Sequence, residues 1–352
     1  MTRETGLAGL PVPLETPPME ALLVEELPTG DGWQFEPKWD GFRCLAFRAG
    51  DAVELKAKSG KDLTRYFPEA AAMLAALPRK RFVLDGELLI PAGGSFSFDA
   101  LQMRLHPAES RILKLARETP ATLVLFDCLM DARGRSLLAA PLGERRAALE
   151  ALFAAVDPPP SLRLSPATRS RATAARWLDR SGGALDGVVA KRLGGPYRPG
   201  ERAMLKVKRR RTADCVVGGF RYASGARLVG SLLLGLYDAE GLLDHVGFTS
   251  GFAGLDRAAL TRDLEALIEP PGFTGNRPGG PSRWTTERSA AWQPLKPQLV
   301  VEVRFDQVTE GRFRHGTKLI RWRPDKAPRQ CTFEQIAEPA GPALARLLAR
   351  AG

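Results

Sequence analysis

The sequence has few of the residues that usually build metal centres or disulfide frameworks. Its 352 residues include four cysteines and three histidines. The cysteines are scattered and form no CxxC pair, which argues against both a structural zinc site and a disulfide framework; they are Cys44, Cys128, Cys215 and Cys331. Three histidines are also too few to make a histidine-based metal centre the expected arrangement.

Long apolar runs are missing as well. No run is long enough to span a bilayer, and the amino-terminal residues, with Glu4 and several prolines, do not resemble a signal peptide. Hydrophobic residues make up 44% of the chain and charged residues 26%, as in soluble globular proteins. We therefore expect a cytoplasmic protein without a membrane partner, and a chain long enough for two domains.

Negative charge is in the minority. The chain carries 51 Lys and Arg residues against 40 Asp and Glu residues, a net charge of +11. An excess of this size favours a polyanionic partner, of which nucleic acid is the usual one. A GC-rich genome is the alternative explanation, because Ala, Gly, Pro and Arg are all abundant here. Charge alone therefore decides little.

Hydrophobic patterns divide the chain into four parts. Residues 1–18 are rich in Pro, Gly and Thr, which predicts an irregular arm. Residues 19–210 mix strands and helices without the regular alternation of a doubly wound sheet, which predicts an α+β domain. Residues 211–340 are β-rich, with a helix between the third and fourth of five short strands, as in an OB-fold barrel. The sequence of residues 341–352 (GPALARLLARAG) predicts a short basic helix at the tail of the chain.

The expected elements follow from the apolar periodicity. Strands of the first domain are expected at residues 33–35, 42–48, 52–57, 81–90, 121–129, 185–191 and 203–208, and helices at 67–77, 98–105, 143–155 and 167–180. Strands of the second domain are expected at residues 214–221, 227–237, 242–249, 298–305 and 317–323, and a helix at 255–268.

One short stretch, residues 34–43 (QFEPKWDGFR), carries the candidate chemistry. Lys38 is followed by Asp40-Gly41, a pair that favours a turn, with apolar strand-like sequence on both sides. A lysine fixed there could attack a nucleotide phosphate. Because a free lysine titrates near ~10.4, nucleophilic use requires neighbouring cations or desolvation. Lys-x-Asp-Gly turns also occur on ordinary surfaces, so this stretch alone does not decide the function.

Six further stretches give Lys38 its context. They are, in order, Lys58-Ser59-Gly60, Asp85-Gly86-Glu87, Leu125-Phe126-Asp127, DGVVAK at 186–191, LKVK at 205–208 and RWRPDK at 321–326. Their order and spacing resemble the motifs of the covalent nucleotidyltransferases, which are the DNA ligases, RNA ligases and mRNA capping enzymes. The resemblance covers residues 19–334. It implies a nucleotidyltransferase (adenylation) domain of antiparallel sheets flanked by helices, followed by an OB-fold β-barrel domain.

Within that superfamily, four phrases resemble the short bacterial ATP-dependent DNA ligases of the C type. They are GWQFEPKWDGFR, LDGVVAKR, PYRPG and LKVKRRRTADCVVGGFR. The ligase module of the bacterial end-joining ligases is similar too. The resemblance thus implies ATP as the cofactor, together with Mg²⁺, which Mn²⁺ can replace.

The resemblance also implies residue roles. Lys38 would attack the α-phosphate of ATP to give a lysyl-AMP phosphoramidate. Glu36 would read the adenine amine, while Arg43 and Glu87 would hold the ribose hydroxyls and a phosphate. Phe126 would stack on the adenine, although packing in the core is a serious alternative because its strand is buried by composition.

A second group would act on phosphates and metal. Lys206 and Lys208, on alternate positions of one strand, would neutralise the α-phosphate. Lys58 occupies a place where ligases commonly have arginine, and would contact the 5′-phosphate of the nick as a point charge. Asp186, where many ligases carry glutamate, would bind the metal together with Glu87. The resemblance further implies that Trp39 binds the nucleotide.

The last motif lies in the second domain. Arg321, Arg323 and Lys326, accompanied by Asp325, resemble the group that moves with the OB domain and orients the pyrophosphate leaving group. Such a group must approach for the first step and leave when DNA binds, which implies a hinge near residues 209–212.

The implied function is an ATP-dependent DNA ligase that seals 5′-phosphate/3′-hydroxyl nicks in DNA repair, through lysyl-AMP and an adenylated DNA 5′-end. We expect a monomer whose partner is nicked double-stranded DNA, with other repair proteins as further candidates. An RNA ligase or a capping guanylyltransferase stays open as an alternative. So does a non-catalytic nucleic-acid-binding OB protein. An NAD-dependent ligase is disfavoured because zinc cysteines are missing.

Overall fold

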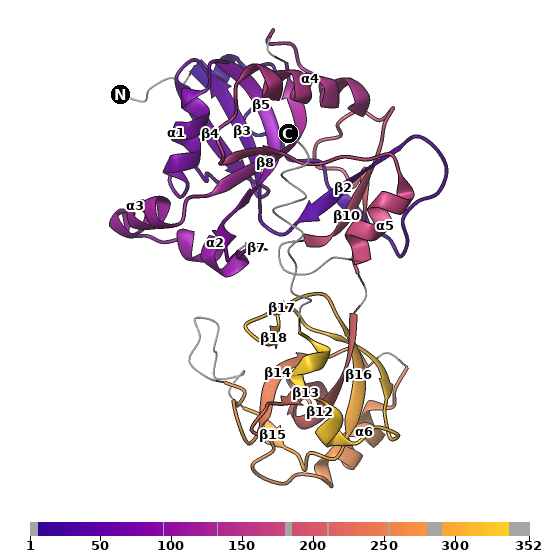
Figure 1. The fold of residues 1–352 in the computed structure, drawn as a ribbon. Coiled ribbons are helices and arrows are strands. Elements are labelled where there is room, and N and C mark those ends of the chain that lie inside the picture. The colour runs from indigo at the N-terminus through magenta and orange to yellow at the C-terminus, as the bar shows by residue number, and fades with distance from the viewer. Residues whose placement is uncertain are drawn as a thin grey trace. The chain divides into compact units, whose positions relative to one another are not determined.

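The structure is a computed structural model that describes residues 6–93, 95–131, 133–179, 185–209, 211–252, 254–279 and 291–337. The chain forms two compact units that meet in sequence after Arg209 (Figure 1). The tail predicted at residues 341–352 lies outside the described residues.

A five-stranded sheet forms the centre of the first unit, in the order β4-β3-β5-β8-β9. Its strands are β3 (Phe42–Ala49), β4 (Ala52–Ala57), β5 (Arg81–Leu89), β8 (Thr122–Met130) and β9 (Leu162–Leu164). All neighbours are antiparallel except β8 and β9. Every residue of β8 is buried, as its unbroken apolar run predicts.

Helices cover one face of this sheet. Figure 1 shows α4 lying across the sheet, where it packs against β8. These helices are α1 (Pro68–Ala76), α2 (Phe98–Arg104) and α4 (Leu142–Ala155), while α3 (Glu109–Glu118) packs against α1. Leu74 of α1 and Leu149 of α4 share one apolar core with Leu84 and Leu125 of the sheet.

The opposite face of the sheet carries the amino-terminal arm. The arm contains one short 3₁₀ turn at Gly6–Gly9. Its side chains Leu7 and Val12 pack in a second core with Phe47, Leu129 and Met204. This arm is irregular in secondary structure but anchored by buried apolar residues.

A smaller four-stranded sheet has the order β1-β11-β10-β2. Its strands are β1 (Ala21–Leu23), β2 (Trp33–Trp39), β10 (Leu185–Arg192) and β11 (Met204–Val207), and helix α5 (Arg171–Asp179) packs on β2 and β10. A hairpin of β6 (Pro91–Ala92) and β7 (Ser95–Phe96) completes the strands described in this unit.

Two glycines beside Lys38 allow neighbouring strands to lie close together, one in each sheet. Gly41 joins β2 to β3, and a Cβ there would collide with the Leu88 carbonyl oxygen. Gly187 has φ of 137° in a β-bulge of β10, pairs with Lys38, and would collide through a Cβ with the Val207 carbonyl oxygen. Only glycine fits both positions. The turn at Asp40-Gly41 predicted from the sequence therefore places Lys38 at the end of a strand.

The second unit is built on a six-stranded antiparallel sheet with the path β14-β13-β12-β16-β19, and β15 pairs with β12. Its elements are β12 (Arg211–Tyr222), β13 (Val229–Tyr237), β14 (Leu243–Thr249), α6 (Arg257–Glu265), β15 (Gln293–Pro294), β16 (Val300–Phe305), β17 (Val308–Thr309), β18 (Arg312–Phe313) and β19 (Lys318–Trp322). A parallel bridge from Thr249 to Thr317 links β14 with β19. The sheet thereby closes on itself as a barrel does, with α6 between the third and fourth long strands.

The α+β class predicted from the sequence is confirmed, but several elements differ from those expected, and the short strands β6, β7, β9, β15, β17 and β18 were not predicted. The helix expected at 167–180 begins only at Arg171, because Thr168 is extended and exchanges two backbone hydrogen bonds with Phe35. Helix α3 and strand β1 were not predicted. Strand β11 ends at Val207, so Lys208 lies just beyond it. Among the described residues, no helix is long and apolar enough to cross a membrane.

Candidate nucleotide-binding site

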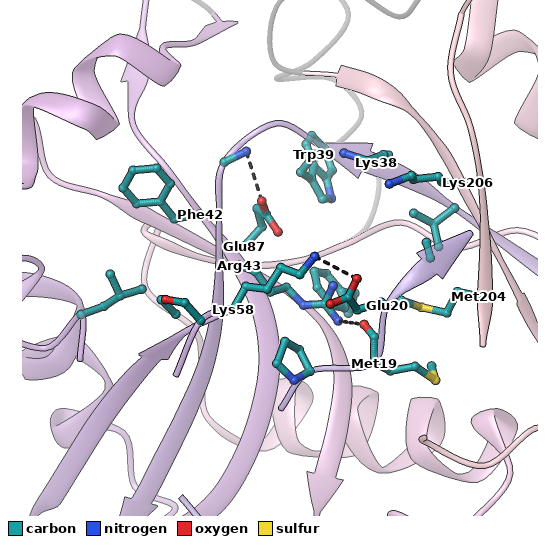
Figure 2. Close-up of a pocket in the computed structure, with 18 of the residues that line it drawn as sticks. Met19, Glu20, Lys38, Trp39, Phe42, Arg43, Lys58, Glu87, Met204 and Lys206 are labelled. Atoms are coloured by element: carbon teal, nitrogen blue, oxygen red, sulfur yellow. Dashed lines mark hydrogen bonds and ion pairs between the residues drawn. The ribbon is translucent and has the colours of Figure 1, made fainter. Parts of the chain in front are cut away.

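A cavity of about 810 Å³ opens in the first unit, lined by residues from both of its large sheets (Figure 2). This volume suits a nucleotide-sized ligand. Eight of the residues predicted from the sequence line it, and they are Glu36, Lys38, Trp39, Arg43, Lys58, Glu87, Phe126 and Lys206. The structure thus brings together residues that are up to 170 positions apart in the sequence.

Lys38 is held by a shared carboxylate. Its Nζ lies 2.5 Å from Oδ2 of Asp186, and Nζ of Lys208 lies 3.2 Å from Oδ1 of the same group. Asp186 is buried, whereas the Lys38 side chain is 24% exposed. The bulge at Gly187 brings Asp186 to Lys38, and two lysines compensate the charge of the buried carboxylate.

Further positive charge surrounds this pair. Lys206 lines the cavity near Lys38, as Figure 2 shows. Burial lowers the pKa of Lys206, and the charges of Lys38, Lys208 and Lys58 lower it further. Closely spaced lysines repel one another, and an anionic ligand such as a polyphosphate relieves that repulsion.

Glu36 lies at the buried end of the cavity. Its Oε2 is 2.8 Å from Nζ of Lys191, and its Oε1 accepts a 2.8 Å hydrogen bond from Nε2 of Gln34. Sequence reasoning assigned no role to Lys191 or Gln34. The signal that could have found them is register, because β10 pairs Lys191 with Gln34 and Val189 with Glu36.

Phe126 forms part of the cavity wall although only 8% of it is exposed. Cζ of Arg43 and Nζ of Lys191 each lie 4.7 Å from its ring centroid. Both interpretations of this residue thus have support: its strand belongs to the core, and its ring borders the site. A base that stacks on Phe126 must share the ring with these cations.

Arg43 is fixed by Asp85. Its Nε and Nη2 donate 2.6 Å hydrogen bonds to the two carboxylate oxygens, and Nη2 also reaches the Met19 carbonyl oxygen at 3.3 Å. Burial alone would lower the pKa of Arg43, but the charge and hydrogen bonds of Asp85 outweigh it and raise this pKa above its ordinary value. Arg43 therefore stays charged at the cavity wall.

Glu87 is a half-buried acid of the cavity wall. It accepts a 3.1 Å hydrogen bond from the Gly41 backbone N–H (Figure 2). Burial raises the pKa of Glu87 to about 7, although the charges of Arg43 and Lys38 act in the opposite direction. A carboxyl group with this pKa changes charge near neutral pH.

The surroundings of Lys58 and Trp39 differ from those expected from the sequence. Nζ of Lys58 lies 3.0 Å from Glu20, a residue of the chain leading into β1 that also lines the cavity and that the sequence analysis missed. Lys58 lowers the pKa of Glu20 through this hydrogen bond and its charge. Trp39 borders the cavity, but its Nε1 donates a 2.9 Å hydrogen bond to Ser165 and its indole is only 4% exposed. Its observed contacts are those of a core residue.

Comparison with known proteins decides the family. Residues 19–208 match the ATP dependent DNA ligase domain, and residues 225–326 match the ATP dependent DNA ligase C terminal region. The chain belongs to the ATP-dependent DNA ligase family. The predicted nucleotidyltransferase domain and OB-type domain are thereby confirmed.

Individual relatives support the same assignment. The ligase is 45% identical to DNA ligase C2 of Mycolicibacterium smegmatis, over 94% of this chain and 96% of that protein. It is 42% identical to DNA ligase C of Mycobacterium tuberculosis, over 94% and 96% of the two chains. It is also 33% identical to the multifunctional non-homologous end joining protein LigD of Mycobacterium bovis, over 86% of this chain but 37% of that longer protein.

Solved structures agree in fold. The structure described as that of Lig E DNA ligases, which bind DNA with a minimal scaffold, superposes with a TM-score of 0.51 at 18% identity, over 87% of this chain and all of that one. The structure named Pmar-Lig_Pre gives a TM-score of 0.56 at 17% identity, over 87% of this chain and 68% of that one. The predicted resemblance to C-type ligases is confirmed by the relatives, which favour a DNA ligase over the RNA ligase, capping and non-catalytic alternatives.

The last predicted motif of the ligase lies in the second unit and forms ion pairs there. Arg321 Nε is 2.7 Å from Glu302, and Arg323 Nη1 is 2.8 Å from Asp214. Lys326 Nζ lies 3.8 Å from Asp214, while Arg323 Nη2 lies 2.9 Å from Asp325. The approach of Arg321 and Lys326 to the nucleotide stays a prediction.

The carboxylates of the site fit a metal ion that is bound jointly by the protein and by the phosphates of the substrate. In the described part of the chain, no group of three or more His, Cys, Asp or Glu side chains could hold a metal ion by itself. Asp186 and Glu87 offer two carboxylates at the site, and Mg²⁺ is commonly held by one or two carboxylates together with substrate phosphates.

Proposed function

We propose that this ligase carries AMP on Lys38. The observation that supports it is the position of Nζ, 2.5 Å from the buried Asp186 and next to a cavity of nucleotide size that four further lysines line, Lys58, Lys61, Lys191 and Lys206. In the reaction, Nζ forms a bond to the α-phosphorus of ATP, the bond from that phosphorus to the bridging oxygen breaks, and pyrophosphate leaves. Nζ must lose its proton and part from Asp186 for this attack.

Neighbouring residues bind and orient the nucleotide. Glu36 accepts a hydrogen bond from the adenine amine, and Phe126 provides a ring face for the base. Arg43 and Glu87 hold the ribose hydroxyls and a phosphate oxygen. Lys206 and Lys208 neutralise the α-phosphate in the transition state, where fixed positive charge lowers the barrier most. Glu87 and Asp186 would hold Mg²⁺ or Mn²⁺, which supplies Lewis-acid polarisation of the phosphates.

In the later steps the ligase acts on DNA. The AMP passes from Lys38 to the 5′-phosphate of a nick, and the 3′-hydroxyl then displaces AMP and seals the strand. Lys58, which lines the cavity, contacts a phosphate of ATP in the first step and the 5′-phosphate of the nick in the later ones. Arg321 and Lys326 orient pyrophosphate in the first step only. The substrate is nicked double-stranded DNA, bound by a monomer, and the net charge of +11 supports phosphate contacts along the duplex. The names of the relatives support a place in DNA repair, with other repair proteins as partners.

Covalent labelling tests this proposal. Purified protein is incubated with α-labelled ATP and Mg²⁺, with labelled GTP and NAD in parallel, and resolved on a gel that is not strongly acidic. We expect label from ATP only, lost in Lys38→Ala. Added pyrophosphate first removes any AMP already present on the protein. The absence of label after that treatment contradicts the proposal, and label from GTP instead would move the protein to the capping enzymes.

A further inference from the structure

Four residues, Arg43 among them, form a closed ring of five hydrogen bonds. The Met19 backbone N–H donates to the Tyr197 hydroxyl oxygen at 2.9 Å, and the Tyr197 O–H donates to Asp85 Oδ2 at 2.7 Å. Asp85 accepts the two 2.6 Å bonds from Arg43, and Arg43 Nη2 returns to the Met19 carbonyl oxygen at 3.3 Å. The ring joins the amino-terminal arm, β3, β5 and the segment between β10 and β11.

The ring determines which nitrogen of Arg43 can meet a ligand. Among the described residues, the hydrogen bonds of Arg43 involve Nε and Nη2. The guanidinium is planar, so fixing these two nitrogens also fixes the direction of Nη1. Arg43 lines the cavity and lies over the Phe126 ring, so this third nitrogen is the one available to the nucleotide.

The Tyr197 hydroxyl stays protonated and acts as a hydrogen-bond donor. It is 3% exposed, and its backbone N–H is bonded to the Leu138 carbonyl oxygen at 2.9 Å. Burial raises the pKa of Tyr197 well above its ordinary value, and the charge of Asp85 adds to this effect. The hydroxyl therefore keeps its proton and donates it to Asp85. Without this donor, Asp85 Oδ2 would retain only Arg43 as a described partner, and Met19 would keep only the 3.3 Å bond from Arg43 to its carbonyl oxygen.

We infer that Tyr197 is a positioning residue for nucleotide transfer, holding Asp85 and Met19 so that Arg43 presents one fixed nitrogen to the nucleotide. This role rests on the proposed function of Arg43 and deepens it. Tyr197 does not line the cavity. Its effect must therefore pass through Arg43, and this distinguishes it from a residue that binds ATP directly.

A double-mutant cycle tests the inference. The second-order rate constant for labelling of Lys38 by α-labelled ATP is measured for wild type, Tyr197→Phe, Arg43→Ala and the double variant. We expect Tyr197→Phe to lower this constant about tenfold, the scale of one hydrogen bond to a charged group. In the Arg43→Ala background we expect Tyr197→Phe to cause no further loss, because the residue it positions is gone.

Tyr222→Phe is the matched control. It removes a hydroxyl that donates a 2.6 Å hydrogen bond to Glu265 in the second unit, and labelling should stay within twofold of wild type. The melting temperature of each variant is recorded, and all rates are measured below the lowest of them. A Tyr197→Phe rate within twofold of wild type overturns the inference, and so does an equal loss in both backgrounds. Absence of label in the wild type would instead overturn the proposed function.

Discussion

At the scale of single residues, the ionisation of Glu87 links the site to pH. Its pKa is raised to about 7 by burial, so the carboxylate needed for hydroxyls or metal forms only as the pH rises through that value. Labelling of Lys38 should therefore increase between pH 6 and 8 in the wild type. In Glu87→Gln labelling should be weaker, and the part of the rise that Glu87 causes should be missing. Identical relative profiles for the two proteins would contradict this role.

The raised pKa of Glu87 also predicts that the stability of the fold decreases as the pH rises, whereas labelling increases. A carboxyl whose pKa is higher in the folded state than its ordinary 4.5 stabilises the fold fully below pH 4.5, and this contribution is lost as the pH rises through about 7. The loss amounts to roughly 3 kcal/mol. Between pH 5.5 and 8, the melting temperature of the wild type should fall relative to that of Glu87→Gln. Parallel melting curves across this range would show that the group does not titrate there.

At the scale of elements, the bulge in β10 aligns Asp186 with Lys38. Gly187→Ala places a Cβ against the Val207 carbonyl oxygen at φ of 137°, a backbone conformation that L side chains rarely adopt. We expect a loss of at least ~2 kcal/mol and a melting temperature lower by about 5 °C or more. Labelling of Lys38 should fall with it. Gly194→Ala is the control, because a Cβ there meets nothing within 4 Å. Equal melting temperatures for the two variants would contradict the account of the bulge.

The arm leading into β1 carries a carboxylate that competes with a ligand phosphate for Lys58. The Glu20–Lys58 pair is partly exposed, with side chains 31% and 59% accessible, so its strength is small and sensitive to salt. Glu20→Gln should lower the KM for ATP about two- to fivefold at low salt. The difference should disappear at high salt.

Glu201→Gln provides the matched control, because it breaks an exposed pair with Arg198 (3.4 Å) in the same unit. Its KM for ATP should equal that of the wild type. An unchanged or higher KM in Glu20→Gln at low salt would show that Glu20 assists nucleotide binding instead of opposing it.

Physical causes explain which strands and helices could be predicted from the sequence. Strand β8 was predictable because its apolar run is long and buried on both faces. Strand β1 has three residues and is half exposed, so no pattern marks it. Helix α3 carries only two buried residues, Ile112 and Ala116. Tertiary contacts rather than local pattern decide β1, whereas α3 is amphipathic and its helical pattern was overlooked.

The site shows the same division. The resemblance to nucleotidyltransferase motifs marked residues such as Lys38 and Glu87, and both line the cavity. Their partners were missed because strand register and chain approach determine them: Lys191 meets Glu36 across β10 and β2, and Tyr197 reaches Asp85 over 112 positions. Asp85 and Tyr197 both lie inside phrases that mark the family, but their joint role becomes apparent only from the hydrogen bonds.

At the scale of the whole molecule, the proposed function requires that AMP is transferred from Lys38 to the DNA. The decisive measurement uses protein labelled at Lys38 and freed of ATP, mixed with a nicked duplex and Mg²⁺ in a single turnover. We predict that label leaves the protein, appears on the 5′-phosphate, and ends as free AMP in proportion to sealed strands, with a nick lacking the 5′-phosphate as control. Label that stays on the protein, or leaves it without sealing DNA, would contradict the central claim.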